Sequence, residues 1–350
     1  IPKNPHYLAL FTLNPLQEVK MSNKMTFGKA IRDAHRYLLE NYPEVFVIGQ
    51  GLWSPWYVGS SMTDLDKDFG TERVIDTPVS EDCCTGVAIG AALSGYKTLV
   101  IHPRMDFMIL ATNQIVNQAA KWSHMLGGQD SPSVTVRGII NRGGQQGAQH
   151  SQALHGWYAN IPGLKVVMPA TPNDARELLI SSVLSGTPVM FVEDRWLYDW
   201  EDEMLPIKEV DLSKQGPNVL KQGEHITLVG SGYTTYQNTK AAKILGGKGV
   251  SAEVVDLRVI NPLDITEVLN SVEKTGRLLA VDSGWANCGL AGEIIAAVSE
   301  KLPATKWKET PKRLTTVNSP APTSGSLEDE FYFNEQDIVN KALEIVRNNQ

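Results

Sequence analysis

Residues 73–101 carry the pattern that decides the fold: RVIDTPVSEDCCTGVAIGAALSGYKTLVI. The segment begins with a short β-branched run (Arg73–Asp76), turns at Pro78, and continues as a helix-like stretch of small residues (Asp82–Ser94). It ends in a second strand-like run, Lys97–Ile101. Proline disfavours the helical region for the residue before it, so the turn separates the strand from the helix. A strand, a helix and a second strand in this order predict a βαβ unit in a parallel sheet.

The same alternation extends along the chain on both sides of this unit. Further strand-like runs are Val45–Gly49, Val134–Ile140, Leu164–Met168, Val189–Glu193, His225–Gly230, Ser251–Leu257 and Arg277–Asp282. Helix-like segments lie between and beyond them, at Thr26–Glu40, Ile109–His124, Asp174–Ser185, Thr235–Gly246, Asp264–Lys274, Leu290–Lys301 and Glu335–Arg347. Strands separated by helices predict parallel sheets that are covered by helices on both faces.

A polar, acidic stretch interrupts this alternation and divides the chain. Residues 206–222 contain Pro206 and Pro217 and are typical of a linker. We therefore predict an α/β fold of two three-layer domains, residues 24–205 and 223–350, each built on a parallel sheet. Residues 1–23 are interpreted as an N-terminal extension, because they lack the basic start and the cleavage site of a secretory signal.

Composition limits the kind of protein. With 350 residues, 42% hydrophobic and 20% charged, the chain resembles a globular protein that has room for two cores. The net charge of −7, without a cluster of Lys and Arg, argues against nucleic-acid binding, and no apolar run is long enough to span a membrane. Three cysteines without a C-x-x-C pair give no disulfide framework. We expect a cytoplasm-like compartment, with the mitochondrial matrix as the alternative.

The turn after Asp76 is the first candidate for chemistry. In open parallel sheets, ligands bind at the carboxyl ends of strands and at helix N-termini, and Glu81 lies where such a strand meets a helix. Two interpretations of Glu81 stay open at this point. A carboxylate in a first helical turn stabilises the helix through its macrodipole, which is the commoner role. The alternative is a catalytic acid.

The loop after Val134–Ile140 is a second candidate. It contains glycines, amides and His150 within residues 143–152, and is either an ordinary surface loop or the lining of a polar pocket. His150 and His155 are five residues apart, which fits no metal signature, so we predict no metal site in this chain.

The run His102-Pro-Arg-Met-Asp-Phe107 is a third candidate, at the end of another strand. Phe107 could stack on an aromatic ligand, and Arg104 could bind a carboxylate or a phosphate. The structural alternative is a turn that buries one aromatic ring.

Taken together, these motifs resemble the β subunit of the decarboxylating first component of 2-oxo acid dehydrogenase complexes, a transketolase-like superfamily that includes the pyruvate, branched-chain and acetoin types. The resemblance runs from about Met25 to the C-terminus. Its matching stretches are Arg73-Val-Ile-Asp-Thr-Pro-Val-Ser-Glu81, Asn113-Gln-Ile-Val-Asn-Gln-Ala-Ala-Lys121, Ala148-Gln-His-Ser-Gln152, Pro162-Gly-Leu-Lys-Val-Val-Met-Pro169, Glu253-Val-Val-Asp-Leu-Arg-Val-Ile-Asn-Pro-Leu-Asp264 and Ser271-Val-Glu-Lys-Thr-Gly-Arg277.

The resemblance implies a pyrimidine-binding domain followed by a transketolase C-terminal-like domain, with thiamine diphosphate as cofactor. Glu81 matches the glutamate that hydrogen-bonds the N1′ atom of the aminopyrimidine, and Phe107 matches the aromatic residue that packs on it. His150 matches a histidine near the reacting carbon, where it orients the substrate or assists acyl transfer to lipoate. The candidate substrate contacts are Arg104, His102 and Gln149.

The family's Gly-Asp-Gly motif, which holds Mg²⁺ and the diphosphate, is absent from these 350 residues. The resemblance therefore implies an α subunit that binds Mg²⁺ in an α2β2 heterotetramer, a lipoyl acyltransferase core as a further partner, and a small 2-oxo acid as substrate. The expected function is decarboxylation of that acid and transfer of the acyl group to lipoate. Two alternatives stay open. One is the C-terminal half of a split transketolase or another two-subunit carboligase, and the other is a non-catalytic scaffolding subunit.

Overall fold

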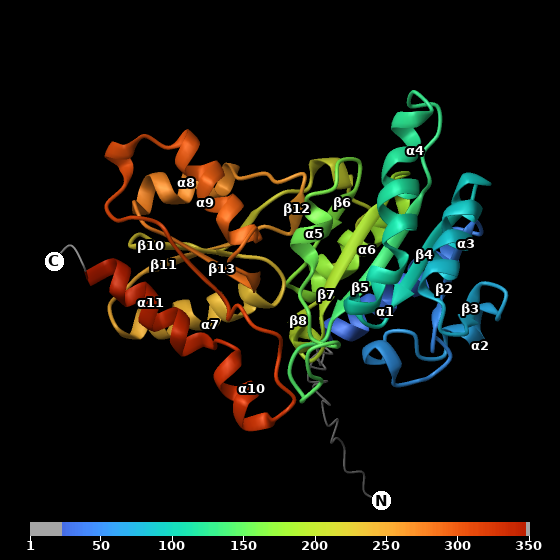
Figure 1. The fold of residues 1–350 in the computed structure, drawn as a ribbon, viewed down its shortest axis with the longest axis horizontal. Helices are drawn as coiled ribbons and strands as arrows, with labels where there is room; N and C mark the ends of the chain where they lie inside the picture. Colours follow the sequence, from blue (N-terminus) through green and yellow to red (C-terminus); the bar gives the residue numbers. More distant parts are fainter. Residues whose placement is uncertain (1–22, 348–350) are drawn as a thin grey trace, which may run out of the picture.

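Figure 1 shows the computed structural model of the protein, which describes residues 23–347. Two α/β halves lie side by side, each around its own sheet. The predicted extension, residues 1–23, lies outside the described residues except for its last one. No helix within residues 23–347 is both long and apolar enough to cross a membrane. The predicted α/β fold with two mostly parallel sheets is confirmed.

The first half contains a seven-stranded sheet in the order β12-β6-β7-β5-β4-β2-β3. Its strands are β2 (Val45–Gln50), β3 (Val74–Thr77), β4 (Lys97–His102), β5 (Val134–Ile140), β6 (Lys165–Val167), β7 (Val189–Asp194) and β12 (Val259–Asn261). All neighbours are parallel except β12, which runs antiparallel to β6. Every residue of the central strands β5 and β7 is buried, as expected for strands covered on both faces.

Helices cover both faces of this sheet. On one face α1 (Phe27–Asn41) packs against α6 (Pro172–Leu184). On the other face lie α3 (Glu81–Leu93) and the helical segment of residues 105–125. The sequence specifies where two of these helices begin. The side chain of Thr26 caps α1, and Thr171 caps α6 just before a proline at the first helical position, where the missing N–H costs nothing.

The second half contains a five-stranded sheet in the order β14-β13-β10-β11-β9. Its strands are β9 (Asn218–Lys221), β10 (Ile226–Gly230), β11 (Ala252–Asp256), β13 (Leu278–Trp285) and β14 (Lys312–Thr316). Helices α7 (Tyr233–Gly247) and α11 (Glu335–Arg347) cover one face. Helices α8 (Thr266–Thr275) and α9 (Leu290–Lys301) cover the other.

Smaller elements complete the chain. They are the ribbon of β1 (Lys24–Thr26) and β8 (Glu201–Glu203), the short helices α2 (Leu65–Phe69), α5 (His155–Ala159) and α10 (Gly325–Phe331), and the 3-10 turns η1 (Tyr57–Ser60), η4 (Arg195–Leu197), η5 (Leu212–Lys214) and η6 (Ala304–Lys306). The predicted linker, residues 206–222, includes β9, which joins the second sheet as an antiparallel edge strand.

The helix predicted over Ile109–His124 is not a single α-helix. A 3-10 helix, η2 (Met105–Ala111), is followed by a π-helix, η3 (Asn113–Ala119), and then by α4 (Ala120–Met125). The spacing of apolar residues indicated a helix with one buried face but did not distinguish these helical types. Phe107 lies in the 3-10 part of this segment, η2, which begins three residues after the end of β4.

The two halves share one apolar core. Buried side chains from the α3 face of the first sheet and from the α8 and α9 face of the second form a continuous cluster. Strand β12 strengthens this connection, because it belongs to the second half of the chain and pairs with the first sheet. The position of the second half is therefore tied to the β6 side of the sheet that carries the candidate site.

Candidate active site

The predicted site residues follow three strands of the seven-stranded sheet. Glu81 begins α3 after β3, Phe107 lies in η2 after β4, and His150 lies in the loop after β5. Helix α3 packs against η2. The rings of Phe107 and His150 meet edge to face, with centroids 5.2 Å apart and an interplanar angle of 80°. The structure therefore brings together an aromatic ring and a histidine that are 43 positions apart in the sequence.

Glu81 is almost fully buried, with 5% of its surface exposed. Within residues 23–347 its carboxylate has no hydrogen-bond or ion-pair partner. Glu81 is the first residue of α3, and the N-cap residue of this helix, Ser80, makes no side-chain capping bond. A buried carboxylate costs free energy unless a donor is supplied. Since the described part of the chain does not supply that donor, the geometry fits a donor from a ligand.

His102 is connected to the backbone of Glu81 through Thr85. It is fully buried, and its Nε2 lies 3.0 Å from the hydroxyl oxygen of Thr85. The Thr85 hydroxyl also donates to the backbone carbonyl of Glu81 at 2.7 Å. Burial lowers the pKa of His102 to about 4. A contact between His102 and the substrate stays a prediction. The observed hydrogen bonds connect His102 through Thr85 to the backbone of Glu81, so His102 helps to position that residue.

The low pKa of His102 predicts a pH-dependent stability. Unfolded histidine binds a proton near pH 6.5, whereas folded His102 does so only near pH 4. As pH falls from 6.5 to 4 the unfolded state takes up a proton that the folded state excludes, so the free energy of unfolding falls. When the pH is lowered from about 7.5 to about 5, we expect the urea-denaturation midpoint of His102→Gln to fall less than that of the unmodified protein.

The control is His124→Gln, which removes an exposed histidine at the end of α4. This variant should keep the pH dependence of the unmodified protein. If His102→Gln also keeps it, the buried imidazole does not exclude the proton as proposed.

Asp106 is a site residue that the sequence did not single out. Its Oδ1 accepts hydrogen bonds from the backbone N and the Nε2 of Gln152, both at 3.0 Å. Burial raises the pKa of Asp106, against the effect of these bonds. The pair ties η2 to the loop two residues beyond His150, so it helps to hold the rings of Phe107 and His150 in contact. The position of Asp106 directly before Phe107 was a signal in the sequence that could have identified it as a site residue.

The two other predicted substrate contacts lie at the rim. Arg104 is half-buried, and its Nη2 donates to Oε1 of Gln146 at 3.1 Å. Gln149 is exposed at the tip of the loop that carries His150. Their roles toward a substrate stay predictions.

A buried pair connects the His150 loop to the second half. Nε2 of His155, the first residue of α5, lies 2.8 Å from Oδ1 of Asp282 in β13. Asp282 also accepts from the backbone N–H groups of Gly284 and Ala291. Burial alone would raise the pKa of Asp282, but His155 and these donors lower it below its usual value. The pair fixes the end of the loop after β5 that carries His150.

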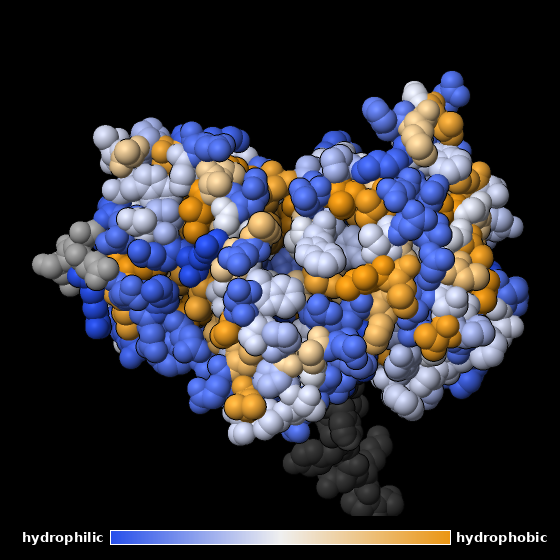
Figure 2. Space-filling model, viewed as in Figure 1, coloured by the Kyte–Doolittle hydropathy of each residue, from blue (hydrophilic) through white to orange (hydrophobic). Residues whose placement is uncertain are grey.

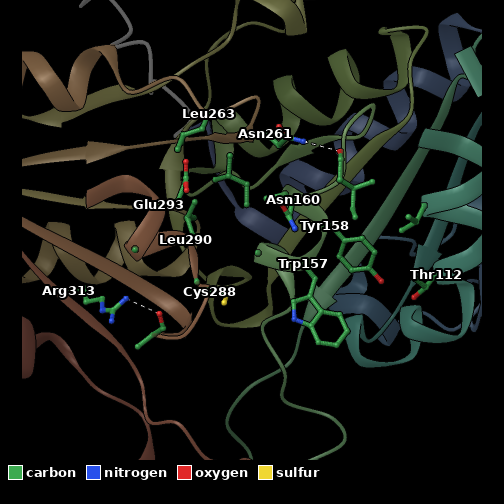
Figure 3. Close-up of a pocket in the computed structure, with 18 residues that line it drawn as sticks. Thr112, Trp157, Tyr158, Asn160, Asn261, Leu263, Cys288, Leu290, Glu293 and Arg313 are labelled. Carbon is green, nitrogen blue, oxygen red and sulfur yellow. Dashed lines mark hydrogen bonds between the residues drawn. The ribbon is translucent and has the colours of Figure 1, made fainter. Parts of the chain in front are cut away.

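A cavity of about 820 Å³ lies between the two halves. In Figure 3 Trp157, Tyr158 and Asn160 lie on one side of it, and Glu293, Leu290 and Arg313 on the other. Glu81, Phe107 and His150 do not line it. A site that is completed by another chain does not form a closed cavity in one subunit, so cavity size is a poor guide here.

Comparison with known proteins identifies the class. Residues 23–200 match the description "Transketolase, pyrimidine binding domain", and residues 217–338 match "Transketolase, C-terminal domain". A solved structure described as "Split gene transketolase, inactive beta4 tetramer" superposes with a TM-score of 0.72 over 92% of this chain and 99% of that chain. Its sequence identity is 21%, so it supports the fold alone. The fold and the site together define a transketolase-like protein.

Curated relatives give the family. The chain is 34% identical to the β subunit of acetoin:2,6-dichlorophenolindophenol oxidoreductase from Cupriavidus necator, over 89% of this chain and 94% of that protein. It is 36% identical to the mitochondrial pyruvate dehydrogenase E1 component subunit β from Saccharomyces cerevisiae, over 92% of this chain and 88% of that protein. The chain belongs to the family of β subunits of thiamine diphosphate-dependent 2-oxo acid dehydrogenases, as its motifs predicted.

Proposed function

We propose that this chain supplies half of the active site of a thiamine diphosphate-dependent enzyme that decarboxylates a 2-oxo acid and passes the acyl group to lipoate. The observation that carries the proposal is the unpaired, buried carboxylate of Glu81 beside η2, which holds Phe107 against His150. An α subunit completes the site.

The residues present fit the pyrimidine end of the cofactor. Glu81 would share one proton with the N1′ atom of the aminopyrimidine, and the resulting hydrogen bond would give its carboxylate the partner that it lacks. Phe107 would pack on the ring with the face that His150 leaves open. When bound, the thiazolium ring of thiamine diphosphate provides the electron sink that decarboxylation of a 2-oxo acid requires.

The chain's own groups then position and move protons. Glu81 would hold and release one proton at its carboxylate, at the start of α3. His150 is held by the edge contact with Phe107 and presents an imidazole toward the substrate, where it orients the acid or assists the acyl transfer. The hydrogen bonds between Asp106 and Gln152 tie η2 to the loop that carries His150.

Exposed apolar side chains next to the site support a partner subunit. On α3 and η2, or just before them, lie Val79 (76% exposed), Val87 (52%), Ile109 (40%) and Leu110 (62%). Figure 2 shows apolar surface on the half that contains the seven-stranded sheet. Apolar groups gathered on a surface favour an interface. An α subunit bound there, in an α2β2 assembly, would bring the Mg²⁺ and diphosphate site.

A lipoyl acyltransferase core is the further partner that transfer to lipoate requires. The cytoplasm, or the mitochondrial matrix, stays the proposed compartment on the basis of cysteine usage. A split transketolase and a scaffolding subunit are less well supported, because the relatives named above are dehydrogenase subunits. A subunit with only a scaffolding role also does not need a buried glutamate whose carboxylate has no partner, as Glu81 has.

Co-expression with a candidate α subunit tests the shared site. We expect calorimetric titration with thiamine diphosphate and Mg²⁺ to show saturable binding by the pair and none by either subunit alone. Leu110→Asp should prevent both assembly and binding, since it places a charge in the apolar surface.

The matched control is Ile244→Asp, an exposed isoleucine on α7 that covers the five-stranded sheet. It should assemble and bind as the unmodified protein does. A well-formed pair that binds no thiamine diphosphate would contradict the proposed function.

A further inference from the structure

A pair of arginines follows strands of the same seven-stranded sheet that carries the candidate site. Arg104 follows β4 and precedes Phe107 by three residues, and Arg195 begins η4 directly after β7. Strands β7, β5 and β4 are neighbours in the sheet, and the loop after β5 contains Asn141 and Gln146. These two amides lie between the arginines and connect them.

The connection is a chain of hydrogen bonds. Nη1 of Arg195 donates to Oδ1 of Asn141 at 2.9 Å. Nδ2 of Asn141 contacts Oε1 of Gln146 at 3.4 Å, and Nη2 of Arg104 donates to the same oxygen at 3.1 Å. Asn141 is 1% exposed, so a buried amide uses both of its ends to hold this arrangement. One N–H group of half-buried Arg104 and one of exposed Arg195 are therefore held before any ligand arrives, which reduces the entropy cost of binding.

The positive charges of these arginines are not balanced within the described part of the chain. Neither Arg104 nor Arg195 forms an ion pair there, although the protein has an overall net charge of −7. Two nearby carboxylates are already engaged, since Asp194 pairs with Arg142 at 2.7 Å and Asp106 accepts two hydrogen bonds from its own loop. A guanidinium carries five N–H groups, and each of these two uses one in the chain of amides.

We propose that Arg104 and Arg195 together bind a second anionic group of the substrate, so that the enzyme prefers 2-oxo acids with a carboxylate or phosphate-type group at the far end. This inference rests on the proposed function. A 2-oxo acid has one carboxylate of its own, which leaves as carbon dioxide. Arg104 lies in the turn after β4 and Arg195 begins η4 after β7, so both follow strands of the sheet whose carboxyl ends also carry Phe107 and His150. Guanidinium forks bind carboxylates and phosphates bidentately.

Substrate preference of the assembled α/β enzyme tests the proposal. Three probes differ mainly at the far end: 2-oxopentanoate is neutral there, 2-oxoglutarate carries a carboxylate, and 2-oxo-4-phosphonobutanoate carries a phosphonate. We expect kcat/KM to be about 10- to 100-fold higher for one of the anionic probes than for the neutral one. Whichever anionic probe is preferred identifies the group as a carboxylate or a phosphate type.

The variants Arg104→Gln and Arg195→Gln should each reduce this ratio of kcat/KM toward one. The control is Arg347→Gln, an exposed arginine at the end of α11 that should keep the ratio. Equal or better turnover of 2-oxopentanoate, or a ratio that both variants keep, overturns the inference. Loss of assembly in either variant, with an unchanged ratio in the assembled fraction, assigns the arginines to the interface instead.

Different experimental outcomes contradict the proposed function and the inference. An assembly that binds thiamine diphosphate but turns over none of the three acids contradicts the proposed function, and the inference falls with it. An assembly that turns over 2-oxo acids with a neutral preference contradicts the inference alone.

Discussion

Glu81→Gln is expected to lower the turnover of 2-oxo acids by about 10²- to 10⁴-fold, the usual contribution of one well-placed acid or base. Glutamine keeps the length and nearly the volume of the buried side chain, so the α3 helix and the assembly should form. It cannot exchange a proton with the aminopyrimidine as a carboxylate does. The measurement is kcat with an artificial electron acceptor, together with calorimetric binding of thiamine diphosphate to the same preparation.

Asp82→Asn provides the matched control for this prediction. Asp82 is the next residue of the same helical turn, is exposed, and accepts a hydrogen bond from Gln114 at 3.1 Å. Both variants remove one negative charge near the N-terminus of α3, so both lose the same macrodipole interaction of about 0.3–1 kcal/mol. Equal turnover by the two variants would mean that Glu81 stabilises the helix and takes no part in the chemistry.

The fold could be predicted from the sequence because its strands are apolar and its helices are amphipathic or small-residue segments. Both sheets, and every helix that the sequence predicted except one, appear close to the expected positions. The missed strands have a common cause. β1, β8, β9, β12 and β14 lie at sheet edges and are three to five residues long, so they carry little periodic signal. Pairing of β12 with β6 depends on tertiary contacts between the two halves.

The site was predictable only in part. Glu81, Phe107 and His150 each follow a strand, so their common edge could be expected once the sheet was parallel. Their supporting contacts could not, because each joins residues far apart in sequence. Asp106 meets Gln152 across 46 positions, and His155 meets Asp282 across 127. Patterns along a chain report periodicity and local turns, whereas such pairs follow from how the two halves pack.

Glu193→Leu is expected to lower the free energy of unfolding by about 3–5 kcal/mol, because it leaves a buried arginine without its counter-ion. Arg137 on β5 and Glu193 on the neighbouring strand β7 are diagonal neighbours that form an ion pair, and both side chains are fully buried. Glu193 Oε2 accepts from Nη2 of Arg137 at 3.0 Å and from the hydroxyl of Tyr198 at 3.1 Å. Nη2 of Arg137 also donates to Ser61 at 2.7 Å, so few other groups can take over the charge.

The double variant Arg137→Met with Glu193→Leu separates the cost of an unpaired charge from the strength of the pair. Replacing both partners by apolar groups is often neutral, so the double variant should recover most of the loss. Glu273→Gln is the surface control, since its ion pair with Lys306 at 2.7 Å is exposed and should contribute about 0–1 kcal/mol. The measurement is the urea-denaturation midpoint of each variant. If Glu193→Leu is no less stable than Glu273→Gln, removing the counter-ion of Arg137 costs nothing and the prediction is wrong. If the double variant is less stable than Glu193→Leu, the charges of the pair themselves stabilise this sheet.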